Sequence, residues 1–210
     1  MKKIFPLLAA LILLPACERG QGMSLKPFEE TFGTPQKFQV CHGFGCTIRT
    51  DVSLNAAEWR SVLEPFAAPA ANAQEERQQI AVTVGRMETM VQQKTGMNTD
   101  YAKATTFERD QDQMDCIDEA INTTRTLRFI EKAGMLRWND VVDPVHRGYF
   151  VDAMWPHNSG AVKDKQTGQK YVIDSYYADT GKPADIVPLE IWLNNWSPER
   201  AGLLDHSSDQ

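Results

Sequence analysis

Three side chains in the second half of the chain have the chemistry needed for nucleophilic catalysis: Cys116, His157 and Asp174. Cys116 follows Asp115, a natural helix N-cap, so the thiol is expected in the first turn of a helix. There the free backbone N–H groups and the helix dipole stabilise a thiolate. A histidine is the usual group that activates such a thiol, and a carboxylate is the usual group that orients the histidine.

His157 and Asp174 are expected to meet across a β-hairpin. Residues 159–163 and 170–176 are typical of strands, and the intervening Asp-Lys-Gln-Thr-Gly-Gln is a turn with a late glycine. A turn centred between residues 166 and 167 pairs Ser159 with Asp174. His157, Ser159 and Asp174 then share one face, with His157 and Asp174 as diagonal neighbours. A register shifted by one residue would put them on opposite faces.

The elements that must hold these residues are helices followed by strands. Three helices are expected, over 56–66, 74–95 and 116–133. The apolar residues that recur at helical spacing in the second of them are Ile80, Val84, Met87 and Val91. Strands are expected at 38–40, 47–49, 136–142 and 148–155, besides the two of the hairpin. Residues 97–113 are expected to form a loop, and 186–196 a final strand or a short helix.

The Asp-Cys-Ile-Asp-Glu-Ala stretch at 115–120 is similar to the start of the catalytic helix in bacterial transglutaminase-like cysteine proteinases. His157 at a strand start and Tyr-Val-Ile-Asp-Ser at 171–175 resemble the histidine and aspartate strands of that superfamily. The resemblance covers residues 107–178. It implies an α+β fold of the transglutaminase/papain-like type, with helices packed on an antiparallel sheet, and a Cys116–His157–Asp174 triad. The candidates for the oxyanion hole are the Cys116 backbone N–H and the side chains of Gln111 and Gln113.

The first residues are expected to be a targeting signal rather than part of the fold. Lys2 and Lys3 precede an apolar run that is too short to span a bilayer. The run ends in Leu-Pro-Ala-Cys, which resembles a bacterial lipoprotein signal and implies lipid on Cys17; an ordinary signal peptide cut nearby is the alternative. The expected organisation is a lipoprotein signal peptide at 1–16, a lipid-anchored tether at 17–27, a transglutaminase-like domain at 28–196 and a loose C-terminal tail at 197–210.

The cysteine count singles out Cys116 as an unpaired thiol. With Cys17 lipidated, Cys41 and Cys46 in Cys-His-Gly-Phe-Gly-Cys can close a short disulfide in an oxidising periplasm. Two alternatives stay open: Cys116 pairs with one of these two cysteines, or it is a buried, inert side chain. A zinc site on Cys41, His42 and Cys46 is disfavoured, because no second ligand pair has suitable spacing. Redox chemistry is disfavoured because the spacing is not Cys-x-x-Cys.

Charge and composition limit the classes of function that the chain can have. The 210 residues hold 22 Lys+Arg against 28 Asp+Glu, so nothing supports a nucleic-acid binder that works by phosphate neutralisation. We expect an outer-membrane lipoprotein that faces the periplasm and acts, without cofactor or metal, as an amide or peptide hydrolase or acyltransferase on protein or peptidoglycan peptides. The alternative is a non-catalytic binding or structural lipoprotein, in which tryptophans could form a carbohydrate or peptide platform. The tryptophans are Trp59, Trp138, Trp155, Trp192 and Trp196.

Overall fold

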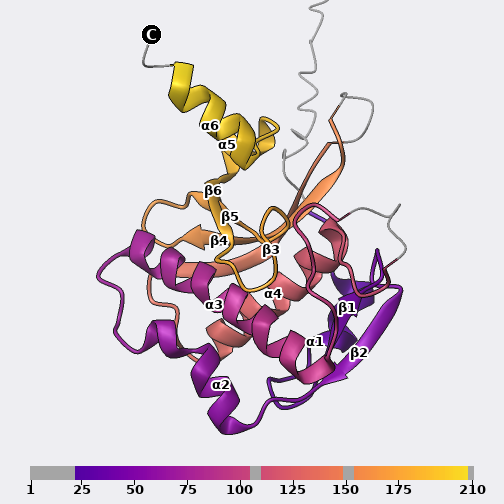
Figure 1. Ribbon diagram of the computed structural model, residues 1–210. Helices are drawn as coiled ribbons and strands as arrows, with labels where there is room; N and C mark the ends of the chain where they lie inside the picture. The colour runs from indigo at the N-terminus through magenta and orange to yellow at the C-terminus, as the bar shows by residue number, and fades with distance from the viewer. Residues whose placement is uncertain (1–21, 105–109, 149–153, 208–210) are drawn as a thin grey trace, which may run out of the picture.

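The computed structural model describes residues 22–104, 110–148 and 154–207, with side chains up to residue 202. The predicted signal peptide at 1–16 and the lipidation site Cys17 lie outside these residues. The described chain is an α+β domain, as predicted, with a four-stranded and a two-stranded antiparallel sheet and helices that pack against both (Figure 1).

Helices dominate the first two thirds of the domain, and the larger sheet follows them. The helical elements are η1 (Lys26–Phe28), α1 (Glu29–Phe32), α2 (Ala56–Val62), η2 (Glu64–Phe66), α3 (Ala73–Thr95), α4 (Cys116–Lys132), α5 (Leu189–Leu193) and α6 (Pro198–Ser207), of which η1 and η2 are 3-10 turns. The strands are β1 (Phe38–His42), β2 (Ile48–Val52), β3 (Asn139–Arg147), β4 (His157–Asp164), β5 (Lys170–Asp174) and β6 (Asp185–Pro188).

The three long helices begin where side chains satisfy their first backbone N–H groups. Asn55 caps α2 and Asp115 caps α4, each in a capping box with the acidic residue three positions on. Asn72 caps α3, which ends at Gly96 with a left-handed φ of 69°. The predicted starts of these helices and the end of α3 therefore agree with the structure to within a residue.

The larger sheet runs β3-β4-β5-β6, and each strand is antiparallel to the next. In the β4–β5 hairpin Gly160 pairs with Ile173 and Ala161 with Val172, which is the register expected from the sequence. The β3–β4 pairing is irregular between Val142 and Val145, where Pro144 has no backbone N–H to contribute to the ladder.

Helices cover both faces of this sheet. On one face, Val84 of α3 and Leu127 of α4 pack against Val162 of β4 and Ile173 of β5. On the other face, α5 places Leu189 and Trp192 over Val145, Ala161, Val172 and Val187. Because side chains alternate along a strand, Asp174 shares the α5 face with Val172, and His157 shares it with Ala161. The predicted hairpin dyad thus lies on the face that α5 covers.

Several predicted element boundaries are wrong. α2 ends at Val62 instead of residue 66, because Pro65 cannot continue the helix and the chain forms the turn η2. The strand predicted at 136–142 is β3, which begins at Asn139 and continues to Arg147 through Pro144 by its irregular pairing. Of the strand predicted at 148–155, residues 148, 154 and 155 lie outside any strand, and 149–153 are not among the described residues. The segment at 186–196 contains both a strand and a helix, β6 and α5.

The two ends of the predicted domain also differ from expectation. Met23 and Leu25, in the predicted tether, pack against the cluster that contains Cys41 and Cys46. Residues 198–207 form α6 where a loose tail was expected. Pro198 at the first helical position and an acidic residue in the first turn both suit a helix N-terminus.

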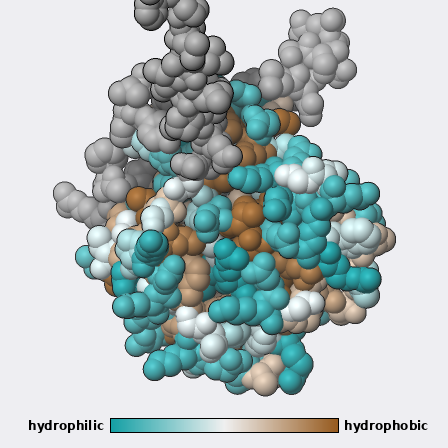
Figure 2. Space-filling model, turned by 180° about the vertical axis from the view of Figure 1, so that it is seen from behind, coloured by the Kyte–Doolittle hydropathy of each residue, from teal (hydrophilic) through white to brown (hydrophobic). Residues whose placement is uncertain are grey.

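The surface seen from the back of the molecule is mostly hydrophilic, with apolar residues visible between polar ones (Figure 2). The large apolar side chains with the highest exposure come from four separate segments and are Val82, Tyr101, Trp155 and Ile191. Among the helices that the structure describes, none combines the length and apolar character needed to cross a bilayer.

Candidate active site

Cys116 is the first residue of α4, and its half-buried thiol is free of any disulfide. The Asp115 carboxylate accepts hydrogen bonds from the N–H groups of Ile117 and Asp118, both at 3.0 Å. The Asp118 carboxylate accepts one in return from the Asp115 N–H. The cap thus satisfies the second and third N–H groups of the helix and leaves that of Cys116 outside the capping scheme. A thiolate at this position faces the positive end of the helix dipole.

His157 opens β4 and Asp174 closes β5, and the two are diagonal neighbours in the observed register. The His157 Nε2 atom lies 2.9 Å from the Asp174 Oδ2 atom. This is the contact that the predicted register requires. Both residues are buried, with 4% and 1% of their surfaces exposed, so the pair is screened from water.

The Cys116 thiol lies near the same imidazole, whose pKa it helps to raise. Because Asp174 occupies Nε2, Nδ1 is the ring nitrogen left for the sulfur. The Sγ atom also lies 3.9 Å from the Pro156 carbonyl oxygen, so the start of β4 lies beside the start of α4. The three side chains singled out in the sequence are therefore brought together in the order thiol, imidazole, carboxylate, which suits nucleophilic catalysis.

The charge of the carboxylate governs the titration of the imidazole. Burial by itself lowers the pKa of His157, but the charge and hydrogen bond of Asp174, assisted by Cys116, outweigh burial and raise this pKa to about 9. Burial likewise acts to raise the pKa of Asp174, yet the charge and hydrogen bond of His157 and the Trp192 hydrogen bond leave it below its ordinary value. The buried pair is therefore most stable as an imidazolium next to a carboxylate.

Aromatic rings enclose this ion pair. The Trp192 Nε1–H donates to Asp174 Oδ2 at 2.8 Å, the same oxygen that His157 binds. The centroid of the His157 ring lies 5.4 Å from that of Trp192, 4.9 Å from Tyr176 and 5.5 Å from Tyr177. The Arg147 guanidinium stacks 4.4 Å from the Trp192 ring centroid. These rings fix the imidazole and exclude water from the pair.

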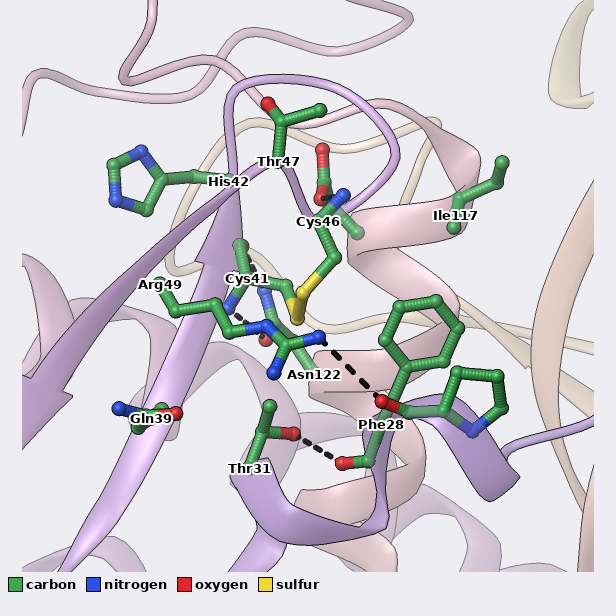
Figure 3. Close-up of a disulfide and its surroundings, with 12 residues drawn as sticks. Phe28, Thr31, Gln39, Cys41, His42, Cys46, Thr47, Arg49, Ile117 and Asn122 are labelled. Carbon is green, nitrogen blue, oxygen red and sulfur yellow. Dashed lines mark hydrogen bonds between the residues drawn. A yellow bond between two sulfur atoms is a disulfide. The ribbon is translucent and has the colours of Figure 1, made fainter.

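A disulfide supports the helix end that carries the thiol. Cys41 and Cys46 are bonded to each other, as predicted, and Phe28 and Ile117 pack near the sulfur atoms (Figure 3). All four residues at 43–46 have left-handed φ angles between 58° and 74°. This turn aims the N–H groups of Phe44 and Cys46 at the Asp118 carboxylate, at 2.9 and 2.6 Å. Asp118 is two residues from Cys116, so the loop holds the first turn of α4.

Asn122, one turn further along α4, ties the helix to the same loop. Its side-chain oxygen accepts from the Cys41 N–H at 3.0 Å, and its Nδ2 donates to the Cys41 carbonyl at 2.8 Å. These two bonds copy a strand-like pairing between the helix and β1 (Figure 3). The disulfide loop and α4 consequently form one connected unit beneath the thiol.

Buried acids connect α4 to the segment that precedes it. Burial is the main cause that raises the pKa of Asp100 to about 7 and that of Asp118 to about 7. Burial and the nearby charge of Asp100 also raise the pKa of Glu119, which accepts a hydrogen bond from the Ser175 hydroxyl. Asp100 accepts from the Met114 N–H at 2.7 Å. Asp100 thus holds the residues just before α4, and Glu119 joins the first turn of α4 to the residue that follows β5.

The two glutamines predicted as oxyanion-hole candidates make other contacts in the structure. Gln113 is excluded, because its Oε1 accepts from the Tyr101 N–H at 3.0 Å and its Nε2 donates to the Thr99 carbonyl at 2.8 Å, away from the thiol. Gln111 contributes its backbone carbonyl to His42 at 2.7 Å. The amide that does lie near the sulfur is that of Asn158, with Nδ2 4.0 Å from Cys116 Sγ. The sequence signal for Asn158 was only its position next to His157.

The residues of the disfavoured zinc site have structural roles. His42 is held between Gln111 and Thr50, and its neighbours Cys41 and Cys46 are bonded to each other. Within the described ranges no group of three or more His, Cys, Asp or Glu residues is arranged to hold a metal. Among the tryptophans, Trp192 is fully buried at the His–Asp pair, whereas Trp155 is 64% exposed.

Comparison of the chain with known protein families, with curated proteins and with solved structures returned no match. The site geometry and the sequence are therefore the basis for assigning a function.

Proposed function

We propose that this chain is a cysteine-dependent amide or peptide hydrolase or acyltransferase with Cys116 as nucleophile, His157 as base and acid, and Asp174 as the group that orients His157. The observation that carries the proposal is the buried His157–Asp174 pair, at 2.9 Å, with the half-buried thiol of Cys116 at the start of the strand that holds His157, 3.9 Å from the Pro156 carbonyl oxygen. Structural histidine–aspartate pairs do not require a free thiol at a helix N-terminus beside them.

The reaction follows from the roles of these groups. The thiol proton passes to His157, and the Cys116 thiolate attacks the carbonyl carbon, forming an S–C bond while the carbonyl π electrons move to the oxygen. The tetrahedral intermediate collapses, the C–N bond breaks, and His157 returns the proton to the leaving amine. Water or an amine then attacks the acyl carbon and gives a proton to His157, the S–C bond breaks, and the Cys116 thiolate leaves. The product is a carboxylic acid after attack by water or a new amide after attack by an amine. Asp174 keeps its charge throughout and holds the imidazole.

The domain proposed for this chemistry is of the transglutaminase/papain-like type, over residues 28–196. The arrangement that supports it is a helix that begins at the cysteine and packs on an antiparallel sheet, in which adjacent strands carry the histidine and the aspartate. The order Cys, His, Asp along the chain agrees with the resemblance noted in the sequence.

We place the enzyme in the cell envelope, anchored through lipid on Cys17 to the outer membrane and facing the periplasm. The N-terminal sequence and the disulfide at Cys41 and Cys46, which suits an oxidising compartment, both favour this location. Proteins or peptidoglycan peptides are the substrates of the proposed class that this compartment supplies.

The test is the alkylation rate of Cys116 by iodoacetamide as a function of pH, on the full chain in detergent, with Cys116→Ser to identify the reacting thiol. Rapid alkylation near about pH 6 that is lost in His157→Ala would support the pair, because an ordinary thiol is protonated there. A Cys116 that reacts only after the protein unfolds would refute the proposal. It would leave the alternative of a non-catalytic binding or structural lipoprotein.

A further inference from the structure

Asn158 lies at the reacting sulfur without a role in the triad. It follows His157 in β4, and by strand alternation its side chain leaves on the opposite face of the sheet, toward α4. The side chain is buried, and its Nδ2 atom lies 4.0 Å from Cys116 Sγ. A buried amide beside a nucleophile calls for a partner, because an unsatisfied N–H in the interior is unfavourable.

His146 of β3 sets which end of this amide faces the sulfur. It pairs with Asn158 across the β3–β4 ladder, and its Nδ1 lies 3.0 Å from Asn158 Oδ1. Its Nε2 lies 2.8 Å from the carbonyl oxygen of Gly148. With Asn158 Oδ1 directed at His146, the NH2 group of Asn158 is turned to Cys116.

The position of this NH2 group suits an oxyanion more than a resting thiol. The oxyanion of a tetrahedral adduct is two bonds from the sulfur, so a donor 4.0 Å from Sγ can come within about 2.7–3.1 Å of it. The backbone N–H of Cys116 offers a second donor, because the Asp115 cap leaves it outside the capping scheme. Two donors that converge on one oxygen are the usual construction of an oxyanion hole.

We propose that Asn158 is a catalytic residue that donates its Nδ2–H to the oxyanion, together with the Cys116 N–H, and that His146 is the positioning residue that orients its amide. This rests on the proposed function of Cys116. It replaces Gln111 and Gln113 as the source of the side-chain donor.

Two reactions of the same sulfur separate this role from a merely structural one. Acylation by p-nitrophenyl acetate passes through an oxyanion: an S–C bond forms, the carbonyl electron pair moves to oxygen and returns, and p-nitrophenolate leaves. Alkylation by iodoacetamide is a direct displacement of iodide and forms no oxyanion. A residue that serves the oxyanion affects the first rate and spares the second.

The experiment measures both rates on the full chain in detergent at mildly acidic pH, for the wild type, Asn158→Ala and Asn158→Leu. Asn194→Ala, at an exposed amide on the C-terminal side of α5, is the matched control. Loss of one oxyanion donor is expected to slow acylation by about 100-fold, as is typical of hydrolases. Alkylation should stay within about twofold of the wild-type rate, since the thiolate is unchanged, and His146→Ala should slow acylation less than Asn158→Ala.

The outcomes separate the two proposals. A wild type that is acylated rapidly, with Asn158→Ala and Asn158→Leu acylated equally fast, overturns the role of Asn158 and leaves the triad intact. Equal losses in acylation and alkylation show that Asn158 supports the thiol structurally, which also overturns it. A wild type that undergoes neither reaction quickly overturns the proposed function itself, and the role of Asn158 with it.

Discussion

Replacing Asp174 by asparagine tests the electrostatic argument most directly. The substitution keeps the shape of the side chain and removes the charge that holds His157 in its cationic form. Asp174 is fully buried and its Oδ2 lies 2.9 Å from His157 Nε2, so little solvent screens the interaction. Burial of His157 is then opposed by Cys116 alone, and we expect the pKa of His157 to fall from about 9 to its ordinary value of 6.5 or below.

The size of the effect follows from these two values. The difference between a pKa of about 9 and the ordinary value of 6.5 corresponds to a preference of about 3 kcal/mol for the imidazolium. At about pH 7.5 an imidazole with a pKa near 9 is almost fully protonated, whereas one at 6.5 is about one-tenth protonated. The population of the thiolate–imidazolium pair, and with it the alkylation rate of Cys116 at that pH, should therefore fall at least about tenfold.

The assay is a pH titration of the four histidine rings by NMR, with the His157 signal assigned from its absence in His157→Gln. The free energy of unfolding gives a second readout. Because the folded pKa of His157 is raised, its contribution to stability is complete below about pH 6.5 and is lost as pH rises through about 9. Asp174→Asn should abolish this slope. A His157 that still titrates near 9 in the variant would refute the reasoning.

Three further perturbations probe the surroundings of the site. Trp192→Phe removes the N–H donor of a buried carboxylate and should lower the free energy of unfolding, measured by urea titration, by about 1–3 kcal/mol. The control Trp59→Phe, in another core, should lower this free energy by less. Equal losses in the two variants would argue against the hydrogen bond. Joint replacement of Cys41 and Cys46 by alanine frees a short loop and should lower the free energy of unfolding by about 2 kcal/mol. An unchanged midpoint of urea denaturation would contradict this expectation. Asp100 has a raised folded pKa of about 7, so its contribution to stability is lost as pH rises from its ordinary 3.8 through 7. Asp100→Asn should therefore be more stable than the wild type at about pH 8 and not at about pH 4, and parallel urea-denaturation curves at the two pH values would contradict this.

Local sequence rules predicted the elements and the hairpin that carry the candidate site. Asp115 before an apolar-periodic segment set the start of α4, and the late glycine of the 164–169 turn set the register that aligns His157 with Asp174. These predictions succeeded because caps and tight turns depend on a few adjacent residues. The disulfide followed from two glycines in a four-residue loop.

Contacts between segments that are distant in the sequence could not be predicted from such local rules. Trp192 binds Asp174 only because α5 folds back over the sheet, and no hydrophobic periodicity or motif in the sequence predicts that packing. The strand predicted at 136–142 ended before Pro144, whereas an irregular pairing carries β3 through this proline. Gln113 was a reasonable oxyanion donor by its position in the sequence, but residues 97–104 form hydrogen bonds with both the oxygen and the nitrogen of its amide. Tertiary structure decided each of these cases.

The burial of His157 and Asp174 behind aromatic rings has a consequence for chemical footprinting. Of the three proposed triad groups, only the Cys116 sulfur is partly open to solvent, while the imidazole is 4% exposed. Of these three groups, a small electrophile therefore reaches only the sulfur in the native chain, and an imidazole-directed acylating reagent reacts with His157 only when the rings separate from it. The ratio of the two adducts in one sample reports the fraction of chains whose aromatic enclosure is closed.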